Sequence, residues 1–289
     1  MSSDEKTQKM RAWRKVFPEK KVALIEVGRP PVSADGLLLK VLAAGECMHG
    51  SSHICTSPGV QRYGLGQDGA FAPYIAVRES AAVRVPHGID APMAAVATDA
   101  VLTAYQAVVG RGKVSADETV LLLGLGGLGF NALQILLHIG ARCIAFDKRQ
   151  LVLDEAVKFG IALDDVIPAE TQDIPQWLKD RNVRIDKAID FVGSPATFSA
   201  SVEAGGTIVL VGLIGPSPTL NSLLAIRKQL SILCSFAGST EVLQEVLDLI
   251  AQGAIKPQVI TRPLSELAQV LDDLHAGKIK SRVALIPGG

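Results

Sequence analysis

The chain has 289 residues, and 48% of them are hydrophobic, which suffices for one large or two modest domains with a buried core. Lysine plus arginine and aspartate plus glutamate each total 29, so no net charge favours a nucleic acid or an anionic membrane as a partner. Apolar runs such as 120–123 and 208–211 are far shorter than the ~20 residues of a membrane helix, and the four cysteines suit a reducing compartment, so we expect a cytoplasmic protein.

The first part of the chain is predicted to form a small β-rich domain. Short apolar runs, many of them β-branched, are typical of strands and occur at 22–27, 37–43, 71–77 and 82–85. Proline, glycine and serine separate these runs, as expected of turns between strands.

Between about residues 92 and 253 the pattern alternates strands with amphipathic helices, which predicts an α/β fold with a doubly wound parallel sheet. The expected strands are 120–123, 142–146, 165–167, 188–191, 208–211 and 231–235. The expected helices are 128–139, 151–159, 174–179 and 240–252, while 197–203 leaves room for only a short helix. After residue 253 we expect a strand at 259–261, a helix at 264–275 and a last strand at 282–286, and we expect this tail to return to the N-terminal domain.

A glycine-rich turn follows the first of these central strands and opens the first helix. It contains Gly124, Leu125, Gly126, Gly127, Leu128 and Gly129. In this context Gly124 permits the tight turn, Gly126 lets the backbone approach a pyrophosphate, and Gly129 lets the helix pack closely on the strand. The helix N-terminus offers free N–H groups to phosphates. The motif therefore predicts a Rossmann dinucleotide-binding site.

The residues at the end of the next strand bear on which dinucleotide binds. Asp147 lies eighteen residues after Gly129, where a carboxylate can accept hydrogen bonds from the adenosine ribose hydroxyls. Lys148 and Arg149 follow directly and could attract the 2′-phosphate of NADP, although both could equally be solvated residues at a helix start. Because the acid occupies the strand end, we expect NAD, with NADP as the alternative.

Several segments together resemble the zinc-type medium-chain alcohol dehydrogenases. The resemblance covers nearly the whole chain and rests on 99–105, the glycine turn, 190–193, 209–212 and 277–282, with 40–47 and 66–74 matching the catalytic domain of that family. It implies a GroES-like catalytic domain made of 1–95 and 255–289, here truncated, and a Rossmann domain at 96–254.

The resemblance also implies further site residues. Thr103 would lie beside the nicotinamide, and Arg282 would contact the pyrophosphate. The nicotinamide ribose and carboxamide would be lined by Val192, Gly212, Leu213, Ser235 and Phe236. Each has a purely structural alternative, such as strand-end packing for the apolar residues or a solvated base for Arg282.

The chain departs from that family at the zinc site. The family's Gly-His-Glu motif and most of its four-cysteine lobe are missing, because only a few residues separate Cys47 from His53. Cys47 and Asp99 match two family ligands, and His49 or His53 could replace the lost histidine, but a catalytic zinc needs about three protein ligands in a defined geometry. A separate metal knuckle of Cys47, His49, His53 and Cys55 has poor ligand spacing. We therefore expect no zinc, with Cys47 and Asp99 as remnants.

Two classes of function remain open. The first is a nicotinamide-dependent oxidoreductase that acts on an alcohol, carbonyl or enone, with Thr103 next to the hydride and Cys47, Asp99 and His49 as remaining catalytic candidates. The resemblance implies that, without zinc, a tyrosine or a water molecule donates the proton. The candidate side chains are Tyr63, Tyr74, Tyr105, His49 and His53, and Tyr105 is the least favoured because its helix is expected to pack against the sheet. The second class is a non-redox relative, such as a cyclase, dehydratase, isomerase or ligand-binding protein. The apolar segment 230–236 is expected to be an edge strand that joins a homodimer or tetramer.

Overall fold

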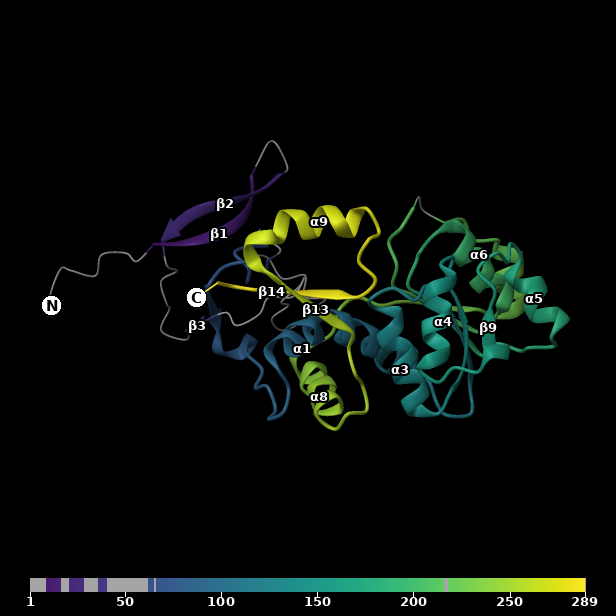
Figure 1. Ribbon diagram of the computed structural model, residues 1–289. Coiled ribbons are helices and arrows are strands. Elements are labelled where there is room, and N and C mark those ends of the chain that lie inside the picture. Colours follow the sequence, from purple (N-terminus) through teal and green to yellow (C-terminus); the bar gives the residue numbers. More distant parts are fainter. Residues whose placement is uncertain are drawn as a thin grey trace, which may run out of the picture. The chain divides into compact units, whose positions relative to one another are not determined.

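The computed structural model describes residues 9–16, 21–28, 36–40, 62–64, 66–215 and 218–288. The chain divides into two compact units. Unit 1 comprises Met1–Asp99, Gly238–Ala251 and Pro257–Gly289, and unit 2 comprises Ala100–Ala237 and Gln252–Lys256 (Figure 1). This division differs from the expected boundaries chiefly at α8 (Thr240–Ala251), which belongs to unit 1 rather than to the cofactor domain.

Unit 2 is built on a six-stranded, entirely parallel sheet. Its strands are β7 (Thr119–Leu123), β8 (Arg142–Phe146), β9 (Val166–Ile167), β10 (Lys187–Asp190), β11 (Thr207–Leu210) and β12 (Ser231–Cys234). Their order is β12-β11-β10-β7-β8-β9, so the winding reverses between β7 and β10. This is the doubly wound Rossmann arrangement, in which ligands bind beyond the carboxyl ends of the strands near the reversal. The predicted fold class is confirmed.

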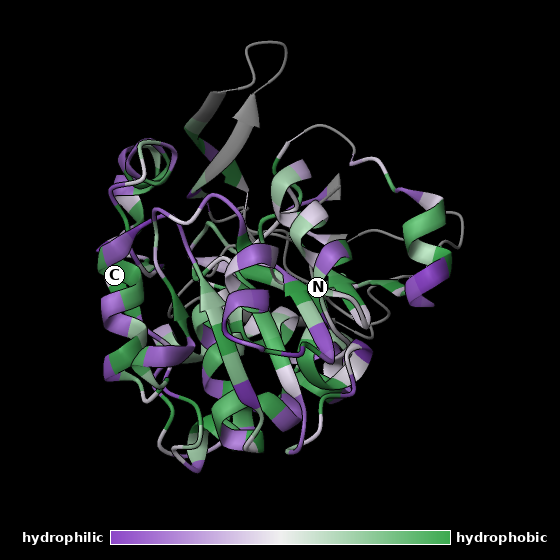
Figure 2. Ribbon diagram, turned by 90° about the vertical axis from the view of Figure 1, so that its right-hand side faces the viewer, coloured by the Kyte–Doolittle hydropathy of each residue, from purple (hydrophilic) through white to green (hydrophobic). Residues whose placement is uncertain are grey.

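The strands of this sheet are hydrophobic because helices cover them. Val120, Leu121, Leu122 and Leu123 are all 0% exposed, and Figure 2 shows hydrophobic colour concentrated on the strands. The helices of unit 2 include α3 (Gly129–Ile139), α4 (Gln150–Lys158), α5 (Ile174–Asp180), α6 (Pro195–Ala204) and α7 (Ser222–Lys228).

Helix α6 is longer than the short helix expected at 197–203. It begins two residues earlier because Ser194 forms a capping box with Thr197 and Pro195 occupies the first turn. Both features favour helix initiation and were readable in the sequence.

A long helical run at Ala91–Arg111 precedes the sheet. It contains α1 (Ala91–Val96) and α2 (Leu102–Tyr105), and the wide π-helical turns Ala97–Val101 and Gln106–Arg111 flank α2. Among the described residues it alone has the length and apolar composition to cross a membrane. Its apolar residues are nevertheless core residues of the protein: Ala97, Ala100, Val101, Leu102, Ala104, Ala107 and Val108 are at most 1% exposed.

Unit 1 contains several two-stranded pairings. The antiparallel pairs are β1 (Lys9–Val16) with β2 (Lys21–Gly28) and β3 (Gly36–Lys40) with β6 (Tyr74–Arg78). The parallel pairs are β4 (Arg62–Tyr63) with β5 (Gly66–Gln67) and β13 (Val259–Pro263) with β14 (Arg282–Ile286). Before β14 the tail forms a single 3₁₀ turn and α9 (Leu267–His275).

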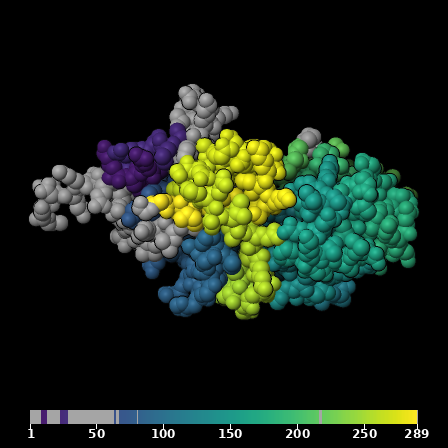
Figure 3. All heavy atoms as spheres, in the orientation of Figure 1, coloured from purple at the N-terminus to yellow at the C-terminus, as the bar shows by residue number. Residues whose placement is uncertain are grey.

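The C-terminal tail joins the N-terminal residues within unit 1. Strands β13 and β14 both contact α1, and the space-filling view shows the yellow C-terminal segment beside blue residues (Figure 3).

Two expectations for the N-terminal part need correction or qualification. Residues 82–85 do not form a strand: they follow a 3₁₀ turn, pair with no strand among the described residues, and are followed by Pro86, which lacks an N–H to donate. Strand β1, rich in lysine and arginine, was not predicted, because its charges obscure the alternating pattern. Residues 41–43 of the expected second strand lie outside the described residues.

Candidate dinucleotide-binding site

The glycine turn adopts a conformation that requires glycine at two of its positions. Gly124 has φ +89°, and a Cβ there would lie 2.6 Å from Cγ2 of Val192. At Gly129 a Cβ would lie 1.8 Å from the carbonyl oxygen of Gly124, because the helix starts directly against the turn. The backbone N–H of Gly124 donates to the carbonyl of Phe146 at 2.9 Å, which ties the turn to β8.

Gly126 differs from these two glycines because, among the described residues, the space that its Cβ would occupy is open. A Cβ at Gly126 would meet nothing within 4 Å, and residues 126–128 are partly exposed at the start of α3. The glycine therefore does not serve packing within the chain. Its open position at a helix N-terminus fits the pyrophosphate of a dinucleotide.

Asp147 follows β8 and faces the glycine turn. Its side chain is only 8% exposed, and it accepts hydrogen bonds from the backbone N–H of Leu125 (2.8 Å) and from the backbone and guanidinium of Arg149. Burial alone would raise the pKa of Asp147, but the hydrogen bonds from Arg149 and Leu125 outweigh it, so this pKa lies below its ordinary value. The carboxylate is therefore ionised at neutral pH.

A second turn follows β10 at the carboxyl edge of the sheet. Asp190 is 0% exposed, and its Oδ1 accepts from the backbone N–H groups of Val192 (2.8 Å) and Gly193 (2.9 Å). Gly193 has φ +71°, and a Cβ there would lie 2.0 Å from the carbonyl oxygen of Gly212. The turns that follow β10 and β11 are therefore in backbone contact, and Val192 touches Gly124 in turn.

Apolar side chains stand exposed beside these turns. Leu213 is 90% exposed and Phe236 is 50% exposed, both just past the ends of β11 and β12. Ser235, which directly precedes Phe236 in the sequence, is buried, and its Oγ has no hydrogen-bond partner among the described residues. Exposed apolar groups and an unsatisfied hydroxyl at the ends of neighbouring strands are suited to a ligand with an apolar ring and a polar substituent.

The predicted residues Thr103, Asp99 and Arg282 fall into different units. Thr103 belongs to α2 in unit 2 and is 6% exposed. In unit 1, Asp99 and Arg282 form an ion pair with Oδ2 and Nη2 3.9 Å apart. Asp99 lies in a π-helical turn, a feature that often marks functional positions in helices. The pyrophosphate contact expected of Arg282 stays a prediction.

The expected remnants of a zinc site are mostly outside the described residues. This holds for Cys47, His49, His53 and Cys55. Elsewhere, in the part of the chain that the structure describes, no group of three His, Cys, Asp or Glu side chains could hold a metal ion. The expectation that zinc does not bind therefore stays a prediction.

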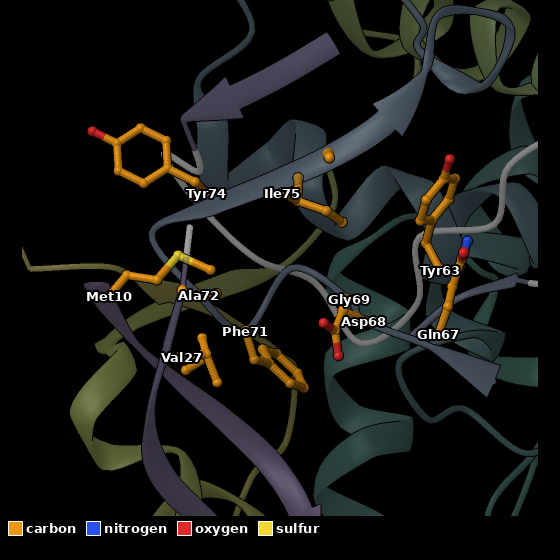
Figure 4. Close-up of a pocket in the computed structure, with 13 residues that line it drawn as sticks. Met10, Val27, Tyr63, Gln67, Asp68, Gly69, Phe71, Ala72, Tyr74 and Ile75 are labelled. Atoms are coloured by element: carbon orange, nitrogen blue, oxygen red, sulfur yellow. The ribbon is translucent and has the colours of Figure 1, made fainter. Parts of the chain in front are cut away.

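Unit 1 contains a cavity of about 570 Å³. Figure 4 shows Met10 and Val27 on one side of it, Tyr63 on the other, and Phe71 and Asp68 between them. Two of the tyrosines proposed as proton donors line this cavity. Tyr63 accepts a hydrogen bond from the backbone N–H of Arg78 (2.8 Å), and the Tyr74 hydroxyl points away from the other labelled side chains.

Comparison with known proteins places the chain in a family. Residues 127–252 match the model of the "Zinc-binding dehydrogenase" family. An alcohol dehydrogenase of Geobacillus stearothermophilus is 30% identical over 245 residues, which is 83% of this chain and 70% of that protein. The chain belongs to the medium-chain alcohol dehydrogenase and reductase superfamily. A NAD-dependent alcohol dehydrogenase of Sulfurisphaera tokodaii is 29% identical, with the same shares of the two chains covered.

Solved structures agree with this family. Acetophenone reductase from Geotrichum candidum, solved in complex with NAD, has a TM-score of 0.86 and 26% identity, with 96% of this chain and 97% of that chain covered. The alcohol dehydrogenase of Aeropyrum pernix has a TM-score of 0.73 and 28% identity, with 86% and 75% covered. The medium-chain fold and the oxidoreductase character of the relatives are as the sequence predicted.

Two residues of the site were not recognised from the sequence. Asp190 was seen only as part of a family motif, although an aspartate followed two and three residues later by turn residues is a signal for side-chain capping of a backbone turn. Arg149 was considered only as a free positive charge. Its ion pair with Asp147 became visible only in the structure, where Nε of Arg149 lies 2.8 Å from Oδ1 of Asp147.

Proposed function

We propose that this medium-chain superfamily member is an NAD(P)-dependent oxidoreductase that transfers a hydride between the nicotinamide and a small or medium alcohol, carbonyl or enone. The observation that carries the proposal is the open glycine turn at Gly126 facing a buried, ionised carboxylate at Asp147. The names of the relatives, which include NAD-dependent alcohol dehydrogenases, support it.

Each turn at the carboxyl edge of the parallel sheet then has a role in binding the cofactor. The N–H groups at the start of α3 bind the pyrophosphate, and Asp147 binds the adenosine ribose. When bound, the cofactor supplies or accepts the hydride. The turn held by Asp190 positions the nicotinamide side of the site, whose proposed lining is Val192, Gly212, Leu213, Ser235 and Phe236, with Thr103 nearby.

The cofactor preference is the first test of this proposal. We expect the protein to bind NADH, and we expect Asp147→Ala to weaken NADH at least about tenfold while improving NADPH, because it removes acceptors for ribose hydroxyls and a charge that repels a 2′-phosphate. Calorimetric titration with both dinucleotides measures this. A wild-type protein that binds neither at millimolar concentration would contradict the proposed function.

We propose that the protein carries no stoichiometric zinc, because its sequence lacks the Gly-His-Glu segment and most of the cysteine lobe of the zinc-type enzymes. Elemental analysis of the purified protein is expected to find far less than one zinc per chain. One tightly bound zinc that is lost on Cys47→Ser or Asp99→Ala would show instead that the site is rebuilt.

The missing Gly-His-Glu segment also favours one alternative, a relative that keeps the cofactor fold but performs no net redox reaction. Incubation with NADH or NADPH and a panel of carbonyl compounds separates the two. Loss of nicotinamide absorbance with any substrate supports the oxidoreductase. Cofactor binding without turnover on the whole panel supports the non-redox alternative.

We further propose a cytoplasmic homodimer, or a dimer of dimers, joined through β12. This strand is at the edge of the sheet and carries no charged residue. Exposed apolar side chains gather just before it: Leu213, Ile214, Leu220, Leu223 and Ile226. An apolar edge of this kind is usually covered. The cytoplasmic location rests on free thiols at Cys143 and Cys234.

Light scattering at micromolar concentration is expected to give at least twice the chain mass of 30.5 kDa. Ile232→Lys is expected to dissociate the dimer, because a lysine cannot be desolvated in a paired strand without cost. Ile232 also packs against the core cluster around Phe198, so a melting curve must show that the variant is folded. A wild-type monomer would contradict the dimer.

A further inference from the structure

The side chain of Asn131 joins the glycine turn to the helical run that carries Thr103. Asn131 lies in the first turn of α3, and it is 3% exposed. Its Nδ2 donates to the carbonyl oxygen of Gly127 (2.8 Å) and to that of Ala100 (3.2 Å). Because an amide nitrogen carries two N–H groups, both bonds form at the same time. One side chain thereby ties together two segments that are far apart in the sequence.

The two carbonyl groups belong to segments to which the proposed function gives different parts of one cofactor. Gly127 is in the glycine turn, which would bind the pyrophosphate. Ala100 is in the π-helical turn Ala97–Val101, and α2 with Thr103, which would lie beside the nicotinamide, follows that turn directly. Helices α2 and α3 contact each other within unit 2, so the amide acts where these segments meet.

The π-helical turn makes the direction of Thr103 sensitive to the local backbone. A π turn closes its backbone hydrogen bonds one residue later than an α turn, and one residue corresponds to about 100° of rotation around the helix. A turn at 97–101 that changed to the α form would therefore rotate Thr103 away from its observed direction. The bond from Asn131 to the Ala100 carbonyl holds this turn from outside the helix.

Packing alone does not require a buried amide at this place. The neighbours of Ala100 in the helical run are apolar, and Ala97, Val101 and Leu102 are at most 1% exposed. An apolar side chain could fill such a contact without burying a polar group. A single polar residue in an apolar helix contact instead fixes the alignment of the two helices at a cost in stability. The two bonds of Asn131 fit this second role.

We propose that Asn131 is a positioning residue, which aligns the Thr103 helix with the glycine turn so that both ends of one dinucleotide are bound together. It acts through the backbone at Ala100 and Gly127 and not through contact with the cofactor. Loss of the amide is therefore expected to weaken the nicotinamide side of the site selectively. This inference rests on the proposed function.

The test compares NADH with ADP-ribose, which has the same adenosine and pyrophosphate but no nicotinamide. The ratio of the two affinities, measured by calorimetric titration, reports the contribution of the nicotinamide, because changes that weaken both ligands alike cancel. Asn131→Leu keeps a side chain of similar size but removes both N–H donors. We expect it to lower the preference for NADH at least about fivefold, while ADP-ribose binds within about threefold of the wild type.

Asn131→Ser separates the two bonds. A serine hydroxyl in a helix can donate to the carbonyl four residues earlier, which here is that of Gly127, but its side chain is too short to reach Ala100 as well. Serine is also smaller than asparagine, so this variant folds without crowding. We expect Asn131→Ser to lower the preference for NADH as Asn131→Leu does, because the bond to Ala100 is the one that positions Thr103.

Gln134 provides a matched control on the same helix. It is also a buried amide, 8% exposed, and its side chain donates to the carbonyl of Lys256 (3.2 Å) and accepts from the N–H of that residue (2.8 Å). Gln134→Leu removes these two bonds, which do not involve the Thr103 helix. It is expected to lower the melting temperature and to leave the preference for NADH unchanged.

The possible results separate this inference from the proposed function. An unchanged preference in Asn131→Leu and Asn131→Ser, or an equal loss in Gln134→Leu, would make Asn131 a purely structural residue and leave the proposed function standing. A wild type that binds NADH no more tightly than ADP-ribose would also overturn the positioning role. A wild type that binds neither ligand would overturn both.

Discussion

Gly126→Ala is expected to leave the protein as stable as the wild type, within about 1 kcal/mol, yet to weaken NADH binding at least about tenfold. In the part of the chain that the structure describes, the added methyl group meets nothing within 4 Å, and Gly126 does not have a positive φ, so the folded protein accommodates it. The same methyl group would stand where the pyrophosphate must approach the backbone. Calorimetric titration and urea unfolding measure the two effects separately.

Gly129→Ala is the contrasting variant three residues along the same turn. Its Cβ would lie 1.8 Å from the carbonyl oxygen of Gly124, so the helix and the turn must separate. We expect this change to lower the free energy of unfolding by more than about 3 kcal/mol. If Gly126→Ala bound NADH as the wild type does, the pyrophosphate would not lie at this turn.

The second large effect is expected at Asp190. Replacement by alanine, which removes the carboxyl group, should destabilise the turn after β10, whereas replacement by asparagine, which removes only the charge, should leave that turn intact. Asp190→Ala leaves the backbone N–H groups of Val192 and Gly193 without their acceptor in a partly buried turn, which we expect to cost about 1–3 kcal/mol of folding free energy. Asp190→Asn keeps an acceptor oxygen of the same shape. We therefore expect the asparagine variant to keep the turn and the alanine variant to lose it, together with much of its NADH affinity.

The wild type and Asp190→Asn should also differ in their dependence on pH. Burial raises the pKa of Asp190 above its ordinary value, more than the hydrogen bonds from Gly193 and Val192 lower it. A carboxyl with a raised pKa stabilises the fold at low pH, and this contribution is lost as pH rises from its unfolded value, about 3.9, through its folded value. Asparagine does not titrate. The free energy of unfolding of Asp190→Asn, relative to that of the wild type, should therefore rise over that pH range and then level off.

Urea unfolding of both proteins at a series of pH values, extrapolated to water, measures this difference. A constant difference between Asp190→Asn and the wild type over the whole series would mean that the carboxyl titrates alike in the folded and unfolded chains. Equal stability of Asp190→Ala and Asp190→Asn would mean that the hydrogen bonds to the turn contribute nothing. The first result would contradict the raised pKa of Asp190, and the second would remove Asp190 from the positioning of the turn.

The parts of the site that were predicted correctly are those that depend on neighbours in sequence. Strand β7, the glycine turn and α3 follow one another without interruption, so the hydrophobic run, the glycine spacing and the helical periodicity all report on one local unit. Asp147 is the first residue after the next strand, and in a parallel sheet that position faces the preceding turn. The alternation of strands and helices predicted a doubly wound parallel sheet of six strands, whereas the order of those strands came from the structure.

The sequence by itself determined the doubly wound sheet, the family and the position of the glycine turn, because each depends on patterns within a few turns or strands. Only the tertiary structure decided which side chains meet. It placed Asp99 beside Arg282, folded Arg149 back onto Asp147, and buried Asp190 with one carboxylate oxygen that has no hydrogen-bond partner among the described residues. These contacts depend on side-chain direction, burial and long-range packing, and none of these physical quantities is encoded in the spacing of residues along the chain.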